Sequence, residues 1–330
     1  MHSTPVILDA NQPPDRFYRG GQRIAEFRGD GPPLGNVPED WVASTTCLFG
    51  ESNLGLSQLP DGELLLDAIR EKPLRWLGPE HVARWGSDTM LLTKLLDAGQ
   101  RLPVHLHPDG RFAAEHLGRS HGKTEAWLIL RGGTVHLGFR RPVSEEELTE
   151  LVDTQDTDSM LDSLHALDVE VGDAVLVPAG VPHAIGSGVF LVEVQEPEDM
   201  SILLEWEGFD FGSDFNPDLG LGMDRALAAT NLKQYSRAEV ARLIVSGPDS
   251  FDGLPSQADP FFRAQRVAQG PIEQGFAVLV ITEGKGAVSW DSGSMSVAAG
   301  TVLLLPYCVS GVALLGEIEG VWCRPPHPGF

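Results

Sequence analysis

The chain has 330 residues, of which 42% are hydrophobic and 22% are charged, so it can bury a sizeable core and is not expected to be disordered. Its 47 acidic residues exceed the 24 Lys and Arg residues, giving a formal charge of −23, which disfavours nucleic acid and membrane surfaces as partners. The three cysteines, Cys47, Cys308 and Cys323, form no disulfide framework, and the N-terminus has no signal-peptide pattern, so we expect a cytoplasmic protein.

The N-terminal third combines loops with one helical region. Residues 1–40 are rich in Gly and Pro and are expected to form loops with short strands. Residues 64–77 have a helical pattern that is interrupted at Pro73. The apolar run over 90–99 ends in Gly and predicts a buried strand.

Strand signals recur closely in the middle of the chain. Residues 124–130 and 134–139 flank an Arg-Gly-Gly turn, a pattern that predicts a hairpin. Ser144 and Glu147 have the spacing of a capping box, so a helix is expected to begin there and to open an insert over about 144–165. Residues 167–195 then predict three strands separated by two turns.

The C-terminal third is expected to be helical first and strand-rich afterwards. Helices are predicted over 224–232 and 236–245, the second with a capping box at Ser236 and Glu239. Two apolar runs within 276–290 lie on either side of a Gly-centred turn.

One internal repeat is recognisable. Residues 169–185 have the same strand–Gly–strand–Pro rhythm as residues 295–312. The aligned pairs are Gly172 with Gly300 and Pro178 with Pro306. The position of His183 corresponds roughly to Gly311, so the second copy is expected to lack an imidazole and to be structural.

A metal-binding pattern begins at His105 and His107. Residues at i and i+2 of a strand face the same side, so both imidazoles can reach one ion. Alone this signal is weak, because many strands carry such a pair without metal. However, Gly99 lies six positions before His105, and Glu125 is followed seven positions later by Gly132. This is the G-x5-H-x-H…E-x6-G pattern of the first cupin motif.

The second cupin motif, G-x5-P-x-G-x2-H, is completed by Gly172, Pro178, Gly180 and His183. Its glycines and proline favour turns, which would bring a third histidine beside the first two. Three imidazoles and one carboxylate suit a divalent ion. The predicted metal ligands are His105, His107, Glu125 and His183. The alternative is that His183 is a hydrogen-bonded core histidine and that Glu125 is solvated.

These patterns predict a mainly β fold, a double-stranded β-helix of the bicupin type with helical insertions. Residues 1–205 would form a metal-binding cupin domain with N-terminal strands and the short insert. Residues 206–255 would form a helical section, and residues 256–330 a second, metal-free cupin-like half.

Beyond the motifs, the chain resembles the type I mannose-6-phosphate isomerase family. The resemblance is carried by residues 87–110, 122–130 and 169–195, and its most specific parts are HPDG, GKTE and VPAGVPHAIG. Gly-Gly at 20–21 and PEDWVAS at 38–44 are similar to that family's N-terminal segment. The likeness is spread over nearly the whole chain.

The resemblance implies a zinc site, because the family binds zinc through a Gln or His, a His, a Glu and a His. Those roles fall on the four predicted ligands. The family typically has Gln-Val-His-Pro where this chain has His105-Leu106-His107-Pro108, so an imidazole replaces an amide oxygen. Iron, manganese and cobalt also suit such a donor set.

The resemblance also implies a reaction, the interconversion of mannose 6-phosphate and fructose 6-phosphate by proton transfer through a cis-enediol. It assigns Lys123 as a cation at the mouth of the site and Glu193 as the carboxylate base. Each has an alternative: Lys123 could be a solvated turn lysine, and Glu193 could pair with a neighbouring cation. The expected partner is a small phosphosugar.

The chain departs from the family pattern after Glu193. The family usually has an Arg, thought to be catalytic, at the position where Ile202 or Leu203 stands here. Arg225 in a later predicted helix is one candidate replacement. The same segment adds acidic residues that would repel a phosphate: Glu196, Glu198 and Asp199.

Three functions therefore remain open at the level of sequence. The first is a zinc-dependent phosphosugar isomerase. The second is a catalytically altered family member that binds a different sugar or acts as a sugar-binding regulatory protein. The third is a cupin metal-dependent oxygenase, because three histidines and one glutamate also form the ligand set of cupin dioxygenases.

Overall fold

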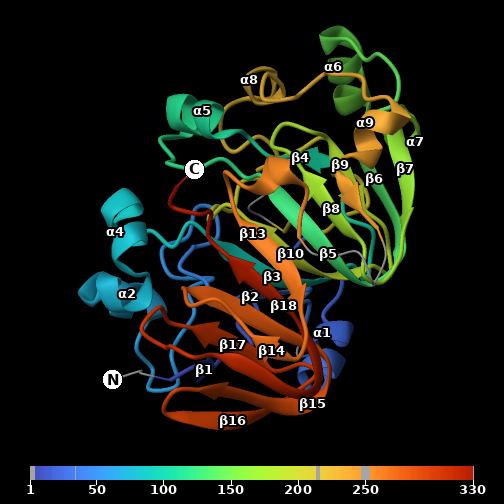
Figure 1. Cartoon of the computed structure of the whole chain (residues 1–330). Helices are drawn as coiled ribbons and strands as arrows, with labels where there is room; N and C mark the ends of the chain where they lie inside the picture. Colours follow the sequence, from blue (N-terminus) through green and yellow to red (C-terminus); the bar gives the residue numbers. More distant parts are fainter. Residues whose placement is uncertain (1–3, 34, 213–215, 247–252, 330) are drawn as a thin grey trace.

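The computed structural model describes residues 4–33, 35–212, 216–246 and 253–329. Its strands form three antiparallel sheets, which confirms the predicted mainly β fold. Two of these sheets lie mainly in the upper part of Figure 1 and carry or adjoin the predicted metal ligands, and the third lies mainly in the lower part.

The first of the two upper sheets has six strands in the order β12-β8-β5-β10-β3-β2. Its strands are β2 (Glu39–Val42), β3 (Leu92–Asp97), β5 (Glu125–Arg131), β8 (Ala174–Val177), β10 (Phe190–Gln195) and β12 (Ile244–Val245). Strand β3 is buried along its whole length, as the apolar run predicted. The sheet supplies Glu125, Glu193 and Lys94 of the candidate site, and Lys123 lies two residues before Glu125.

The other upper sheet has five strands in the order β11-β4-β9-β6-β7. Its strands are β4 (His105–Leu106), β6 (Gly133–Phe139), β7 (Leu164–Val169), β9 (His183–Ile185) and β11 (Ile202–Leu203). Strands β4 and β9 are adjacent in this sheet, so the histidines of both motifs meet there.

The hairpin predicted from residues 124–130 and 134–139 is wrong. Strand β5 pairs with β8 and β10, whereas β6 pairs with β7 and β9 in the other sheet. The chain crosses between sheets at Gly132, where a Cβ atom would lie 2.2 Å from the carbonyl oxygen of Val169. A glycine pair signals a change of direction, but it does not identify the strand that becomes the partner.

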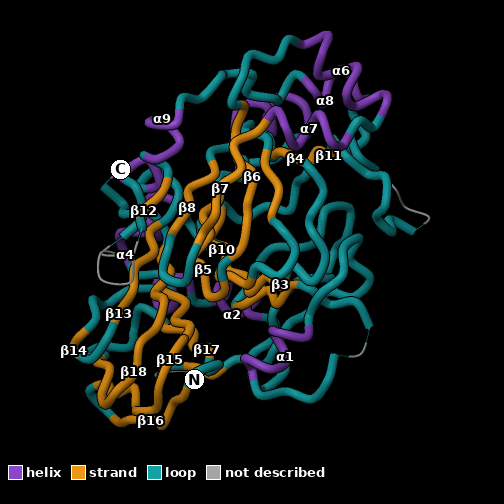
Figure 2. The backbone as a smooth tube through the Cα atoms, turned by 90° about the vertical axis from the view of Figure 1, so that its right-hand side faces the viewer, coloured by secondary structure: helices purple, strands orange, loops and turns teal. Residues whose placement is uncertain are grey.

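The third sheet combines the C-terminal strands with the N-terminal β1, in the order β1-β17-β15-β18-β13, with β14 on β18 and β16 on β15. Its strands are β1 (Val6–Ile7), β13 (Arg263–Val267), β14 (Gly270–Pro271), β15 (Ala277–Trp290), β16 (Gly293–Ala298), β17 (Val302–Leu305) and β18 (Ala313–Arg324). Figure 2 shows the N-terminus beside these strands at the lower end of the molecule.

The Gly-centred turn predicted within 276–290 is also wrong, because β15 is one continuous strand of 14 residues. Its register against β18 shifts between Ile281 and Glu283, and Gly284 has a φ of 79°. The glycine therefore accommodates a local irregularity, as at a β-bulge, while pairing with the long β18 continues on both sides.

The internal repeat is visible in the backbone. Gly172 and Gly300 have φ values of 92° and 88°, and each precedes a buried four-residue strand, β8 or β17. At Gly300 a Cβ atom would lie 1.8 Å from the carbonyl oxygen of Phe27, so the turn requires glycine for space as well as for conformation.

The helices of the described residues are short. They are α1 (Gln22–Arg28), α2 (Leu65–Glu71), α3 (Pro73–Trp76), α4 (Pro79–Trp85), α5 (Gly110–Phe112), the π-helix η1 (Ala113–Leu117), α6 (Glu145–Thr154), α7 (Thr157–Ser163), α8 (Met223–Leu227), α9 (Arg237–Ala241) and the 3₁₀ helix η2 (Ser256–Ala258). The predicted interruption at Pro73 is confirmed. None of the described helices is long and apolar enough to span a bilayer.

The two predicted capping boxes differ. Ser236 and Glu239 form the complete reciprocal pair at the start of α9. Ser144 accepts a hydrogen bond from the Glu147 amide at 3.2 Å, but the Glu147 carboxylate pairs with Arg141 at 2.6 Å instead. One half of the predicted motif therefore forms at α6.

The division into domains at 205 and 255 stays a prediction. Strand pairing adds that Val6 and Ile7 of the N-terminal segment join the C-terminal sheet through β17. A single buried cluster also includes apolar side chains from both ends of the chain. Within the predicted helical section, residues 213–215 and 247–252 lie outside the described residues.

Candidate metal centre and adjoining cavity

Three imidazoles converge in the five-stranded sheet. His105 pairs with His183 across β4 and β9, and His107 directly follows β4. The ring centroids of His105 and His183 are 4.1 Å apart. The ring centroid of His107 lies 5.0 Å from that of His105 and 4.9 Å from that of His183. The i, i+2 spacing therefore places the first pair on one side, and the second motif brings His183 beside it.

Each imidazole is oriented by a backbone carbonyl at its Nδ1 atom. The contacts are His105 to Pro103 at 2.8 Å, His107 to Met200 at 2.6 Å and His183 to Val181 at 2.9 Å. Because a carbonyl only accepts, each Nδ1 carries the proton and each Nε2 presents a lone pair. One nitrogen from each ring lies within 4.8 Å of the others, so this group could hold one metal ion.

Glu125 reaches the imidazoles from β5 of the six-stranded sheet. Its Oε2 lies 2.9 Å from His107 Nε2, and its Oε1 lies 3.4 Å from His183 Nε2. It accepts hydrogen bonds from Trp127 Nε1 at 2.9 Å and Lys123 Nζ at 2.8 Å. Burial alone would raise the pKa of the Glu125 carboxyl, but the Lys123 ammonium and the neighbouring His107 and His183 together outweigh burial, and the pKa lies well below its usual range.

The donor set fits a divalent ion. Burial lowers the pKa of both His107 and His183 to about 3, so at neutral pH they are neutral imidazoles, the form that binds metals. His183 Nε2 is buried and has no hydrogen-bond partner among the described residues. A buried nitrogen without a partner is costly unless a ligand satisfies it.

Lys123 is buried beside these groups, so its interpretation as a solvated turn lysine is wrong. Its Nζ lies 2.8 Å from both His107 Nε2 and Glu125 Oε2, and 3.9 Å from Glu193 Oε1. The lysine therefore links the histidine cluster to Glu193 on β10.

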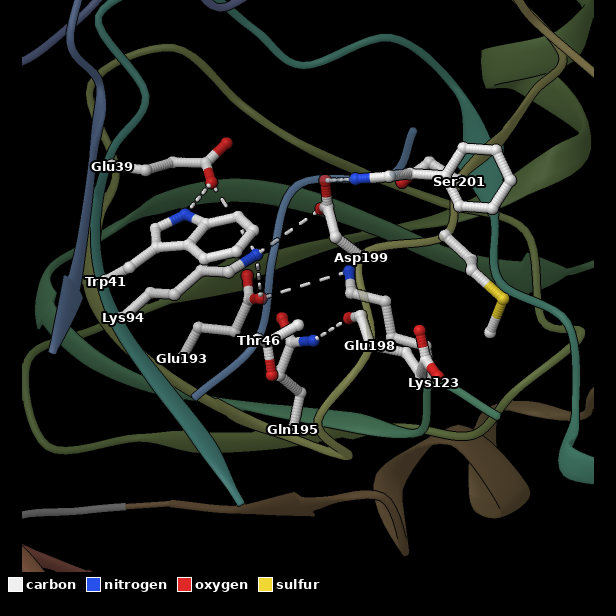
Figure 3. A network of polar contacts seen from close by, with 12 residues as sticks. Glu39, Trp41, Thr46, Lys94, Lys123, Glu193, Gln195, Glu198, Asp199 and Ser201 are labelled. Atoms are coloured by element: carbon white, nitrogen blue, oxygen red, sulfur yellow. Dashed lines mark hydrogen bonds and ion pairs between the residues drawn. The ribbon is translucent and has the colours of Figure 1, made fainter. Parts of the chain in front are cut away.

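Glu193 lies between two ammonium groups, with its Oε1 3.4 Å from Lys94 Nζ and 3.9 Å from Lys123 Nζ (Figure 3). The same oxygen has no hydrogen-bond partner among the described residues. Burial raises the pKa of the Glu193 carboxyl, and Lys94 only partly opposes this. The carboxylate thus pairs with a cation, as one interpretation expected, and it also adjoins the histidine cluster.

Sequence reasoning missed the cluster around Lys94 (Figure 3). Lys94 Nζ lies 3.6 Å from Glu39 Oε2, 4.0 Å from Asp199 Oδ1 and 4.6 Å from the centre of the Trp41 ring. Burial opposes its charge, but Glu193 and Glu39 outweigh burial and raise the pKa of Lys94. The signal was present, because a lysine within an apolar strand that is buried throughout requires an ionic partner.

A cavity of about 1360 Å³ adjoins the cluster. Asp199, Ser201 and Leu203 line one wall, and Ser201 Oγ lies 3.5 Å from His107 Nδ1. Leu203 pairs with His105 between β11 and β4. The cavity therefore reaches the wall of the histidine cluster, and residues of the N-terminal segment 14–19 also line it.

The position of the expected Arg is aliphatic in the structure as well. Ile202 and Leu203 are buried on β11, and Leu203 contacts the cavity. Arg225 on α8 is exposed and is not among the residues that line this cavity, so it does not replace the missing guanidinium. Of the acidic residues in this segment, Asp199 lines the cavity, whereas Glu196 accepts the Thr124 amide at 2.8 Å.

Comparison with known proteins gives one consistent group of relatives, although no family model matches the chain. A mannose-6-phosphate isomerase of Streptococcus mutans is 26% identical over 309 residues, covering 91% of this chain and 92% of that protein. The mannose-6-phosphate isomerase ManA of Bacillus subtilis is 36% identical over 117 residues, which cover 34% of this chain and 36% of that protein.

Solved structures show the same fold. The mannose 6-phosphate isomerase of Bacillus subtilis matches with a TM-score of 0.76 and 20% identity, covering 97% of this chain and 99% of that one. A mannose 6-phosphate isomerase solved with zinc and yttrium matches with a TM-score of 0.72 and 16% identity, covering 98% of this chain and 100% of that one.

Proposed function

The chain belongs to the type I mannose-6-phosphate isomerase family of the cupin superfamily, and from this premise we propose that it is a zinc-dependent isomerase that interconverts mannose 6-phosphate and fructose 6-phosphate. The observation that carries the proposal is the convergence of three oriented imidazoles on a buried carboxylate, with Lys123 and Glu193 alongside.

The ion would be held by His105, His107, Glu125 and His183. Imidazole nitrogens with a carboxylate oxygen form a donor set that zinc favours, and iron, manganese or cobalt could occupy the same site. When bound, a divalent ion supplies positive charge that stabilises the negative charge developing on the sugar oxygens.

Glu193 is the proposed base. Its carboxylate is buried, its pKa is raised, and one oxygen lacks a hydrogen bond within the described part of the chain, which favours proton uptake. It would remove the proton from the carbon next to the sugar carbonyl and return it to the carbonyl carbon, with a cis-enediol between the two steps. Over the two steps the carbonyl oxygen gains a proton and the hydroxyl on the adjacent carbon loses one. Lys123, between Glu125 and Glu193, is positioned to donate to a sugar oxygen.

The test combines elemental analysis of the purified protein with a coupled assay on mannose 6-phosphate. We expect about one divalent ion per chain and measurable turnover. Glu193→Gln should keep the ion and lose about 10²- to 10⁴-fold in kcat. A fully metal-loaded wild-type protein without turnover on phosphosugars would contradict the proposal.

That result would favour the second candidate, a family member that binds a sugar without isomerising it. The specific observation in its favour is the aliphatic pair Ile202 and Leu203, one of which stands where the family usually has an arginine, and Leu203 lines the cavity. Sugar binding in the absence of turnover, measured by calorimetry, would establish it.

A further inference from the structure

The cations of the cavity come from a single N-terminal segment. Arg16 and Arg19 are the only Lys or Arg side chains among the described residues that line it. Arg16 is mostly buried, with 13% of its side chain exposed; its Nε lies 3.0 Å from Glu39 Oε1 and its Nη2 lies 3.8 Å from Asp199 Oδ1. A guanidinium has five N–H donors, so these two contacts leave donors for a ligand.

The position of this segment is fixed by close backbone packing. A Cβ atom on Gly20 would lie 2.0 Å from the carbonyl oxygen of Asp97 at the end of β3. The Gly21 amide donates to Asp97 Oδ2 at 2.8 Å. Asn36 donates through its Nδ2 to the carbonyl oxygens of Arg16 and Tyr18, at 2.6 and 2.7 Å. The arginine-bearing segment is therefore held against the cavity before any ligand arrives.

We propose that Arg16 and Arg19 bind the phosphate group of the sugar phosphate and supply the positive charge that Leu203 does not provide. Guanidinium groups match phosphate oxygens with two parallel hydrogen bonds. Arg16 is the inner contact beside Asp199, and Arg19 is exposed at the rim, where its Nε lies 3.4 Å from Gln100 Oε1. The inference deepens the proposed function and rests on it for the identity of the sugar.

The charge balance predicts that phosphate binding depends on the metal. The connected cations are Arg16, Lys94 and Lys123, and the connected carboxylates are Glu39, Glu125, Glu193 and Asp199. Three positive charges face four negative ones, and a divalent ion changes the net charge from −1 to +1. Removing the metal should therefore weaken the attraction for an anion.

The other carboxylates of the cavity have less effect on the binding of an anion at its inner wall. Asp15, Glu51 and Asp210 also line it, but all three are exposed to solvent. Solvent and salt screen exposed charges strongly and partly buried charges much less. The mostly buried guanidinium of Arg16 should therefore outweigh these exposed carboxylates near the inner wall.

The first experiment measures binding of inorganic phosphate to the metal-loaded protein by calorimetry. Arg16→Gln should raise the Kd about 10- to 100-fold, because a charge-assisted hydrogen bond is lost. Arg19→Gln should raise it about 5-fold. The matched control is Arg23→Gln on α1, outside the cavity lining, which removes the Asp97 partner at 2.7 Å and should leave the Kd for phosphate unchanged. Phosphate binding that is equally tight in wild type, Arg16→Gln and Arg19→Gln would overturn the inference.

The second experiment separates phosphate recognition from folding. The ratio of kcat/KM for mannose 6-phosphate to that for mannose should fall in Arg16→Gln and Arg19→Gln, whereas a structural defect lowers both values together and leaves the ratio unchanged. An unchanged ratio in both variants counts against the inference. If wild type turns over no sugar, the proposed function fails, and phosphate binding still decides the role of the arginines.

Discussion

At the scale of single residues, the most informative groups are buried charges. Glu39 accepts hydrogen bonds from Arg16 at 3.0 Å, Tyr18 at 2.8 Å and Trp41 at 2.7 Å, and it lies 3.6 Å from Lys94. A carboxylate with so many donors organises the arginine and lysine on either side of it. Removing its charge would leave both cations without a main counterion.

Glu39→Gln should therefore lower the free energy of unfolding by about 2–4 kcal/mol at neutral pH, measured by urea denaturation. Glu115→Gln, at an exposed position on η1, should change it by less than about 0.5 kcal/mol. A Glu39→Gln variant as stable as wild type would show that the buried cations do not depend on this carboxylate.

The same residue predicts a pH dependence. Burial would raise the pKa of the Glu39 carboxyl, but Arg16 and Lys94 outweigh it, so the pKa in the folded protein is lowered. Such a group adds stability above its unfolded pKa of about 4.3 and loses it as pH falls toward the folded value. The stability difference between wild type and Glu39→Gln should hold above about pH 5 and shrink below about pH 4; a constant difference from neutral pH down to about pH 3 would contradict this assignment.

His183→Ala should remove about one equivalent of metal, because one of three converging imidazoles is lost. His116→Ala is the control, since His116 is exposed on η1 outside the cluster. Elemental analysis after dialysis provides the measurement. Full metal retention in His183→Ala would refute the ligand assignment.

At the scale of elements, the crossing between β5 and β6 places β5, which begins with Glu125, in a different sheet from β6, which pairs with the strand of His183. Gly132→Ala would place a methyl group 2.2 Å from the Val169 carbonyl oxygen, so we expect a loss of about 2 kcal/mol, measured by thermal unfolding. At Gly31 nothing lies within 4 Å of the position that a Cβ atom would take, and Gly31→Ala should leave stability nearly unchanged. Equal melting temperatures for the two variants would contradict the close approach.

The sequence predicted the strands of the site better than their pairing. Alternation along a strand places His105 and His107 on the same side, and a turn motif brings His183 back. Turn residues do not reveal a partner strand, so β5 and β6 were wrongly paired with each other. Lys94 was missed because the apolar pattern around it indicates burial, and ionic partners such as Glu39 come from distant segments.

At the scale of the whole molecule, the candidate site needs three parts of the chain: the segment 14–21 and the two upper sheets, one of which includes β11. The net charge of −23 opposes an anionic substrate, so recognition must depend on cations gathered locally. Arg16 and Lys94 are gathered in this way by buried carboxylates. Sequence motifs predicted the fold class, whereas this long-range arrangement of charges could not be predicted from the sequence.

Metal removal should lower the stability of the whole protein, because an ion that binds only the folded state stabilises it by mass action. With metal at about 100 times its Kd, chelation should cost about 2.7 kcal/mol, or roughly 5 °C in Tm for a chain of this size. The Tm of His183→Ala should not respond to the chelator. A wild-type Tm that is equally insensitive would argue against a metal bound at this site.

The most direct test of the proposed chemistry measures the incorporation of deuterium from the solvent into the sugar. Mannose 6-phosphate is incubated with the zinc-loaded protein in deuterated water, and the sugar is monitored by NMR. Proton transfer by Glu193 through a cis-enediol should form fructose 6-phosphate and introduce deuterium at the carbon next to the carbonyl, and Glu193→Gln should slow both processes by about 10²- to 10⁴-fold. If the zinc-loaded wild-type protein yields neither ketose nor deuterated sugar, the isomerase assignment is wrong.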